Sequence, residues 1–110
     1  MAPAPTEPPS PTREPQQLVD DLCDSLLTPR SREDMRRLLL DLCTPAELRT
    51  IAERWHVARL LDGTDLPYRE IHHATGVSTT TIVRVARFLR QEPHGGYRRA
   101  IDALGAGDAG

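Results

Sequence analysis

The sequence contains few of the residues that build aromatic cores, disulfide frameworks or membrane anchors. Aromatic residues make up 4% of its 110 positions, there are two cysteines and no lysine, and no apolar run approaches the roughly 20 residues of a membrane span. The amino terminus also lacks a charged region followed by a hydrophobic one, the pattern of a secretory leader. We therefore expect a cytoplasmic, one-domain protein with a lean aliphatic core that dimerisation completes.

A metal site and an enzyme active site are not indicated either. Cys23 and Cys43 lie on different expected helices among apolar neighbours, so we expect two buried thiols. His56 and His94 are expected to be surface or partly packed groups, and neither CxxC nor HxxxH spacing, nor a catalytic spacing, is present. The sequence predicts no metal, no cofactor and no catalytic residue; a metal sensor built on the cysteines and histidines ranks third among the interpretations.

Charge is distributed unevenly along the chain. All 14 basic residues are arginine, which we attribute mainly to genome composition, although arginine also binds phosphate and guanine with two parallel donors. Residues 68–99 contain six arginines and two glutamates, a formal charge of +4, whereas residues 1–67 contain eight arginines and twelve acidic residues. A basic segment on an acidic body favours a nucleic-acid surface.

Six helical segments and no strand are expected, so the fold class is all-α. Residues 1–15 carry six prolines and little to bury, which predicts a disordered or polyproline-like segment. A helical domain is expected over 16–104, with a flexible carboxy terminus over 105–110. Apolar periodicity and capping residues place the helices at Gln16 to Leu27, from the Ser31 cap to near Cys43, from Pro45 to about Asp62, two within 68–91, and from Tyr97 to Leu104.

The apolar surface of the third helix is wider than that of the first. The first has an apolar stripe formed by Leu18, Val19, Leu22, Cys23, Leu26 and Leu27. The third starts at Thr44-Pro45-Ala46-Glu47, a strong capping signal, and its apolar residues spread over more than one stripe. That helix either threads the centre of the fold or is covered by a second subunit, and we favour the second subunit.

The segment 68–91 has the pattern of a helix, a tight turn and a second helix. Gly76 can adopt the positive φ that ends the first helix, and Ser78 can cap the second. The apolar stripe of the second helix consists of Ile82, Val85, Ala86 and Leu89. Its other face carries hydroxyls and arginines, so we interpret Ser78 to Gln91 as a recognition helix. An ordinary helical hairpin with a solvated outer face is the alternative.

The order of these motifs resembles a known family. The resemblance is carried by CTPAELRTIAERWHVARLLDG, YREIHHATGVSTTTIVRVARFL and GGY, and it extends over roughly Leu18 to Leu104. These runs are similar to the Trp repressor family, and more closely to its YerC/YecD-type branch than to the tryptophan-sensing repressor. The resemblance implies a six-helix, intertwined homodimer whose two helix-turn-helix motifs enter successive major grooves of a pseudo-palindromic operator. It also implies a transcriptional regulator, with repression of an amino-acid biosynthesis or related operon as the leading expectation.

Contacts with double-stranded DNA are expected from both helices of the motif. Phosphate or backbone contacts are expected from Tyr68, Arg69, His73, Ser78 and Arg87. Base-edge contacts are expected from Thr79, Thr80 and Val83. The methyl groups of Val83 are suited to contact a thymine methyl. Arg84 reaches either a phosphate or an effector. His72 occupies a position usually filled by a small residue, and its orientation stays open.

An effector site follows only from the resemblance. In the tryptophan-binding members, the amino acid lies between the core and the recognition helix, and the matching positions here are Thr44, Arg54 and Arg84. Guanidinium groups can pair with a carboxylate and stack on a flat ring. This chain departs from that pattern with Phe88 in place of a small serine and with Asp41 in place of a leucine, so an indole finds less room. We expect any effector to be smaller or more polar than tryptophan, with histidine as the candidate and Asp41 available to its imidazole.

Several alternatives stay open at this point. Arg54 could pair with Glu47 or Glu53 instead of a ligand. Phe88 could fill the pocket permanently, which would make the protein a ligand-independent DNA binder. From another functional class, a dimeric interaction module could use the basic segment to contact an acidic protein partner.

Overall fold

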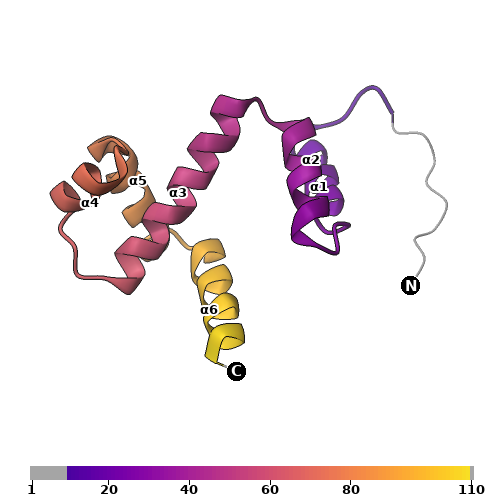
Figure 1. Cartoon of the computed structure of the whole chain (residues 1–110). Helices are drawn as coiled ribbons and strands as arrows, with labels where there is room; N and C mark the ends of the chain where they lie inside the picture. Colours follow the sequence, from indigo (N-terminus) through magenta and orange to yellow (C-terminus); the bar gives the residue numbers. More distant parts are fainter. Residues whose placement is uncertain (1–9, 110) are drawn as a thin grey trace. The chain divides into compact units, whose positions relative to one another are not determined.

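The computed structural model describes residues 10–109, and it describes side chains as far as Gly105. Most of the segment expected to be disordered, residues 1–9, lies outside the described residues, as does Gly110. The described part is all-α and contains no strand, which confirms the expected fold class. Its helices are α1 (Pro15–Leu26), α2 (Arg32–Leu42), α3 (Pro45–Gly63), α4 (Tyr68–Thr75), α5 (Thr79–Arg90) and α6 (Gly96–Ala109), as shown in Figure 1.

The chain divides into two compact units, one that ends at Leu42 and one that begins at Cys43. The first unit holds α1 and α2, which begin where local sequence signals place them. The Glu14 and Gln17 side chains form a capping box at the start of α1. The Ser31 hydroxyl accepts a hydrogen bond from the Asp34 backbone N–H at 3.1 Å, which caps α2 as expected.

The apolar stripe of α1 is not covered within its own chain. Neither α1 nor α2 contains a buried residue. The most exposed large side chains of this stripe are Leu18 at 56%, Val19 at 57% and Leu27 at 82%. Cys23 is likewise exposed and Cys43 only half-buried, so the prediction of two buried thiols is wrong for the single chain. The reason is that a period of apolar residues identifies a face that can be buried, but not the surface that buries it.

The second unit begins with a reciprocal cap. The Thr44 hydroxyl accepts a hydrogen bond from the Glu47 backbone N–H at 3.1 Å, and the Glu47 carboxylate accepts one from the Thr44 backbone N–H at 2.8 Å. The hydrogen bond that the carboxylate accepts from the Thr44 backbone is the largest cause that lowers the pKa of Glu47. The expected cap at Thr44 is therefore confirmed, and it fixes the first turn of α3.

The core of this unit lies between α3 and the helix-turn-helix. It consists of eight buried residues, which are Val57, Ala58, Leu61, Ile71, Val77, Ile82, Val85 and Ala86. Leu89, the last residue of the expected α5 stripe, packs against this cluster from a half-buried position. α5 packs against α3, α4 and α6, and it is therefore the helix on which the others converge (Figure 1). Ile51, on the earlier part of α3, is 49% exposed, so part of this helix lacks the cover that the sequence predicts.

α6 is held to α3 by a bidentate ion pair. The Arg98 guanidinium donates to both carboxylate oxygens of Asp62, at 2.6 and 3.1 Å, and to Asp102 one turn further along α6 at 3.0 Å. The Arg98 hydrogen bonds lower the pKa of Asp62. The helix continues to Ala109, beyond the expected end at Leu104, although Gly105 is a residue that commonly ends a helix.

Candidate nucleic-acid interface

The turn between α4 and α5 has the geometry that the sequence predicts. Gly76 adopts φ 75° and ψ 0°, the left-handed conformation, and its N–H donates to the His72 carbonyl at 2.8 Å. Two residues later, the Ser78 hydroxyl accepts a hydrogen bond from the Thr81 N–H at 3.2 Å and caps α5. The glycine reverses the chain and the serine starts the next helix, so the two helices are joined by only three residues.

α5 separates an apolar face from a polar one. Ile82, Val85 and Ala86 are buried in the core. The opposite face presents hydroxyls at the start of the helix and guanidiniums further along, with Val83 51% exposed between them. All nine predicted DNA contacts are exposed, namely Tyr68, Arg69, His73, Ser78, Thr79, Thr80, Val83, Arg84 and Arg87. This arrangement leaves the polar face free to meet a large partner.

A shallow recess of about 220 Å³ brings the start of α4 next to the end of α5. Its lining includes Tyr68, Val83 and Arg87, three of the predicted DNA contacts, together with Arg90. Arg90 is anchored, because its guanidinium donates to the Leu61 carbonyl of α3 at 3.1 Å. A phenol and two guanidiniums at one recess are suitable donors for a phosphate group.

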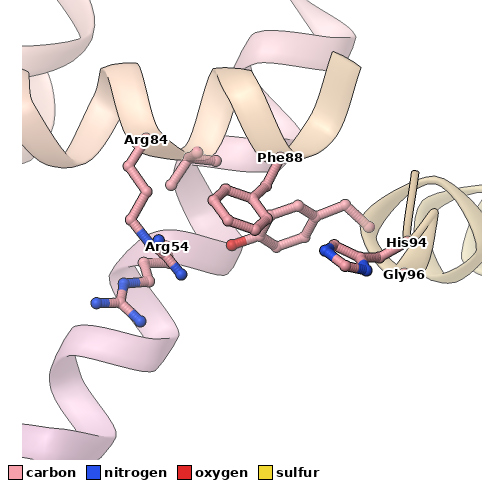
Figure 2. Close-up of a pocket in the computed structure, with 7 residues that line it drawn as sticks. Arg54, Arg84, Phe88, His94 and Gly96 are labelled. Carbon is pink, nitrogen blue, oxygen red and sulfur yellow. The ribbon is translucent and has the colours of Figure 1, made fainter. Parts of the chain in front are cut away.

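A second, larger pocket of about 340 Å³ lies on another side of α5. Arg54 reaches it from α3, Arg84 and Phe88 from α5, and Tyr97 from the start of α6. Figure 2 shows the guanidiniums of Arg54 and Arg84 at one end of this pocket and His94 at the other. The Nε atom of Arg54 is buried and has no hydrogen-bond partner among the described residues. A buried donor of this kind favours an anionic or carbonyl oxygen in the pocket.

The ring of Phe88 already occupies part of this space. The Arg84 guanidinium carbon lies 4.3 Å from the centre of the ring, and that of Arg87 lies 5.0 Å from it. The His94 imidazole stacks on the same ring with 5.9 Å between centroids and 14° between planes. The Arg84 face that would stack on a ligand ring is therefore in contact with Phe88.

The structure brings together some of the predicted effector residues and not others. Arg54, Arg84 and Phe88 line the pocket, whereas Thr44 does not, since it caps the start of α3, well before Arg54. Asp41 belongs to the amino-terminal unit, and its predicted role is not tested by the geometry of this pocket. Four other residues line the pocket and were not predicted, namely Val85, His94, Gly96 and Tyr97. The nearest signal was the GGY run of the family resemblance, in which Gly95 adopts φ 70° directly before α6.

Comparison with known proteins identifies the family. The sequence profile of the Trp repressor protein matches residues 17–104. The chain belongs to the Trp repressor family. Within it, YerC of Bacillus subtilis (strain 168), which is described as uncharacterised, is 38% identical over 86 residues, covering 78% of this chain and 81% of YerC. This match assigns the chain to the YerC-type branch of the Trp repressor family.

Solved structures of Trp repressor relatives support the same fold. A TrpR-like protein from Eubacterium eligens ATCC 27750 superimposes with a TM-score of 0.74 at 32% identity, covering 81% of this chain and 90% of that one. A proposed Trp repressor from Staphylococcus aureus also reaches a TM-score of 0.74 at 30% identity, covering 86% and 96% of the two chains. The all-α fold of the described residues is therefore Trp repressor-like.

Two further features concern residues 10–109 alone. These residues contain no group of three or more histidine, cysteine or acidic side chains that could hold a metal ion. None of their helices combines the length and the apolar composition that crossing a bilayer requires.

Proposed function

We propose that the protein is a homodimeric, sequence-specific transcriptional repressor that places α5 in the major groove of a pseudo-palindromic operator. Membership of the Trp repressor family supports a helix-turn-helix DNA-binding regulator as the general class. The observation that carries the proposal is the exposed face of α5, whose hydroxyls and arginines stand outward while the opposite face is buried. The regulated genes belong to amino-acid biosynthesis or a related process, and the protein acts in the cytoplasm.

The predicted contacts divide into two groups by chemistry. Tyr68, Arg69, His73, Ser78 and Arg87 bind phosphates and set the position of the motif on the duplex. Thr79, Thr80 and Val83 face base edges and read the sequence. The recess that holds Tyr68 beside Arg87 supports the first group, since it places two phosphate-binding side chains from different helices together.

Two single substitutions test this division of roles. Arg69→Ala removes a phosphate contact, so it should weaken binding to all duplexes about equally and reduce the slope of log affinity against log salt by about 1. Thr80→Ala should instead change the preference between operator variants at one position. Electrophoretic or fluorescence titrations of specific and random duplexes at several salt concentrations measure both effects. Equal losses on specific and random duplexes for Thr80→Ala would contradict the assignment.

The pocket between α3, α5 and α6 supports a small effector that carries a carboxylate group. Its two guanidiniums and the unpaired donor of Arg54 are suited to a carboxylate. Because Phe88 lies against Arg84, a ligand smaller than tryptophan fits better, and histidine is the candidate. Since Arg84 belongs to both the pocket and α5, a bound ligand can couple to DNA affinity through this shared helix.

The same contacts of Phe88 favour a second candidate, a repressor that needs no effector. In that case Phe88 takes the place of the ligand ring. Isothermal titration calorimetry with histidine and with tryptophan, repeated on Arg54→Ala, separates the two. The effector proposal predicts histidine binding that Arg54→Ala abolishes and weaker or absent tryptophan binding. Tight tryptophan binding would contradict the steric role of Phe88, and operator affinity unchanged by any amino acid would favour the effector-independent candidate.

A further inference from the structure

Side chains of α4 hold the two peptide groups on either side of Val77, at the turn of the motif. The carbonyl of Val77 lies 2.7 Å from Nδ1 of His72, and the N–H of Val77 donates to the Thr75 hydroxyl at 3.1 Å. That hydroxyl in turn donates to the Ile71 carbonyl at 2.7 Å. Both polar backbone groups of Val77 are therefore fixed by the last turn of α4.

The geometry determines the protonation of His72 at one atom. A carbonyl oxygen can only accept, so Nδ1 of His72 must carry the hydrogen. Nδ1 carries a hydrogen in the neutral Nδ1–H tautomer and also in the imidazolium, so the bond to Val77 is kept in both states. It is therefore a constant part of the turn.

Val77 lies at the point in the chain that sets the direction of α5. Its side chain is only 5% exposed and belongs to the core, and the next residue, Ser78, caps α5. Thr79 and Thr80, which begin the polar face of α5, follow directly. A rotation of the peptide group between Val77 and Ser78 would therefore move the Ser78 cap and both threonines together. The buried contacts of Ile82, further along α5, would change least.

We propose that His72 is a positioning residue for DNA recognition, which holds the first turn of α5 at the angle that base contacts require. This inference rests on the proposed function of the motif. His72 acts through the Val77 carbonyl rather than by touching DNA, and Thr75 holds the preceding peptide group through the Val77 N–H. It also explains why an imidazole is accommodated at a position where a small residue is usual.

Three variants separate this role from general stability. His72→Ala removes the donor, and His72→Asn restores one, because the asparagine amide nitrogen can occupy a place close to that of Nδ1. His56→Ala on α3 is the matched control, since His56 lines a recess with Thr75 and Val77 but its imidazole forms no hydrogen bond among residues 10–109. The measurements are the ratio of specific to random duplex affinity, and two-bond proton–nitrogen NMR spectra of the full chain, which identify the protonated ring nitrogen.

The expected results distinguish this proposal from the proposed function. His72 should show a protonated Nδ1, His72→Ala should lower the affinity ratio by about 3- to 10-fold, as expected for one hydrogen bond, and His72→Asn should recover most of it. His56→Ala should leave the ratio unchanged. An unprotonated Nδ1 in the spectrum, an unchanged ratio for His72→Ala, or no recovery by His72→Asn would overturn the role of His72. If the unmodified protein binds specific and random duplexes with equal affinity, the proposed function fails. The role of His72 in recognition then fails with it, even where the spectrum shows a protonated Nδ1.

Discussion

At the scale of single residues, Phe88 changes what the family pocket can accept. Its ring lies between two guanidiniums and the His94 imidazole, so the space beside Arg84 is filled by a side chain of the same helix. A phenyl ring in contact with a cation has a similar interaction energy to that of a ligand ring in the same place. This one side chain is therefore central to whether the protein responds to an effector at all.

Gly76 is the residue on which the turn of the motif depends. At φ 75° any other residue is strained, and a Cβ added there meets no atom within 4 Å, so the cost of a substitution is conformational rather than steric. Gly76→Ala should destabilise the fold by about 1–2 kcal/mol. Urea denaturation followed by circular dichroism measures the change.

A matched control for Gly76 exists in α3. Gly63 is also free of atoms within 4 Å of an added Cβ, but it lies at the helical end of α3 without a positive φ. Gly63→Ala should therefore leave stability unchanged or increase it by up to about 1 kcal/mol. Equal losses of stability for the two variants would show that the left-handed conformation of Gly76 is not the cause.

At the scale of helices, local signals predicted where each element begins. Thr44 with Glu47, Ser31 and Ser78 each cap a helix at the expected place, because a capping hydrogen bond spans only three residues. The buried stripe of α5 was predicted for the same reason, since it repeats within a single helix. These features depend on neighbours in the sequence and not on the rest of the fold.

The second pocket could be predicted only in part. Arg54, Arg84 and Phe88 were identified through the family resemblance, whereas His94 and Tyr97 enter the pocket because of where α6 lies. α6 meets the rest of this unit through the ion pair between Arg98 and Asp62, which are 36 residues apart, and through Tyr97 and Ile101, which pack against the core. No local pattern indicates such a pair, because many arginines and aspartates in the chain could have formed it.

At the scale of the whole molecule, the uncovered apolar surface supports the proposed homodimer. The exposed leucine and valine side chains of α1 and the exposed Ile51 on α3 are surfaces that a second copy of the chain can bury. The spacing of apolar residues in a sequence shows that a helix face can be buried, but not whether the same chain or a partner buries it. This is why the α1 stripe was predicted as buried. Dimerisation also matches the use of two reading helices on a pseudo-palindromic site.

The most direct test of the account measures the binding of the purified protein to two duplexes of equal length, one protected by it in footprinting and one random. Analytical ultracentrifugation with labelled DNA gives both the affinity and the number of chains on each duplex. The account predicts two chains on the protected duplex and an affinity at least about 10³-fold higher than for the random duplex at physiological salt. Equal affinity for both duplexes, or a single chain on the protected one, would contradict it.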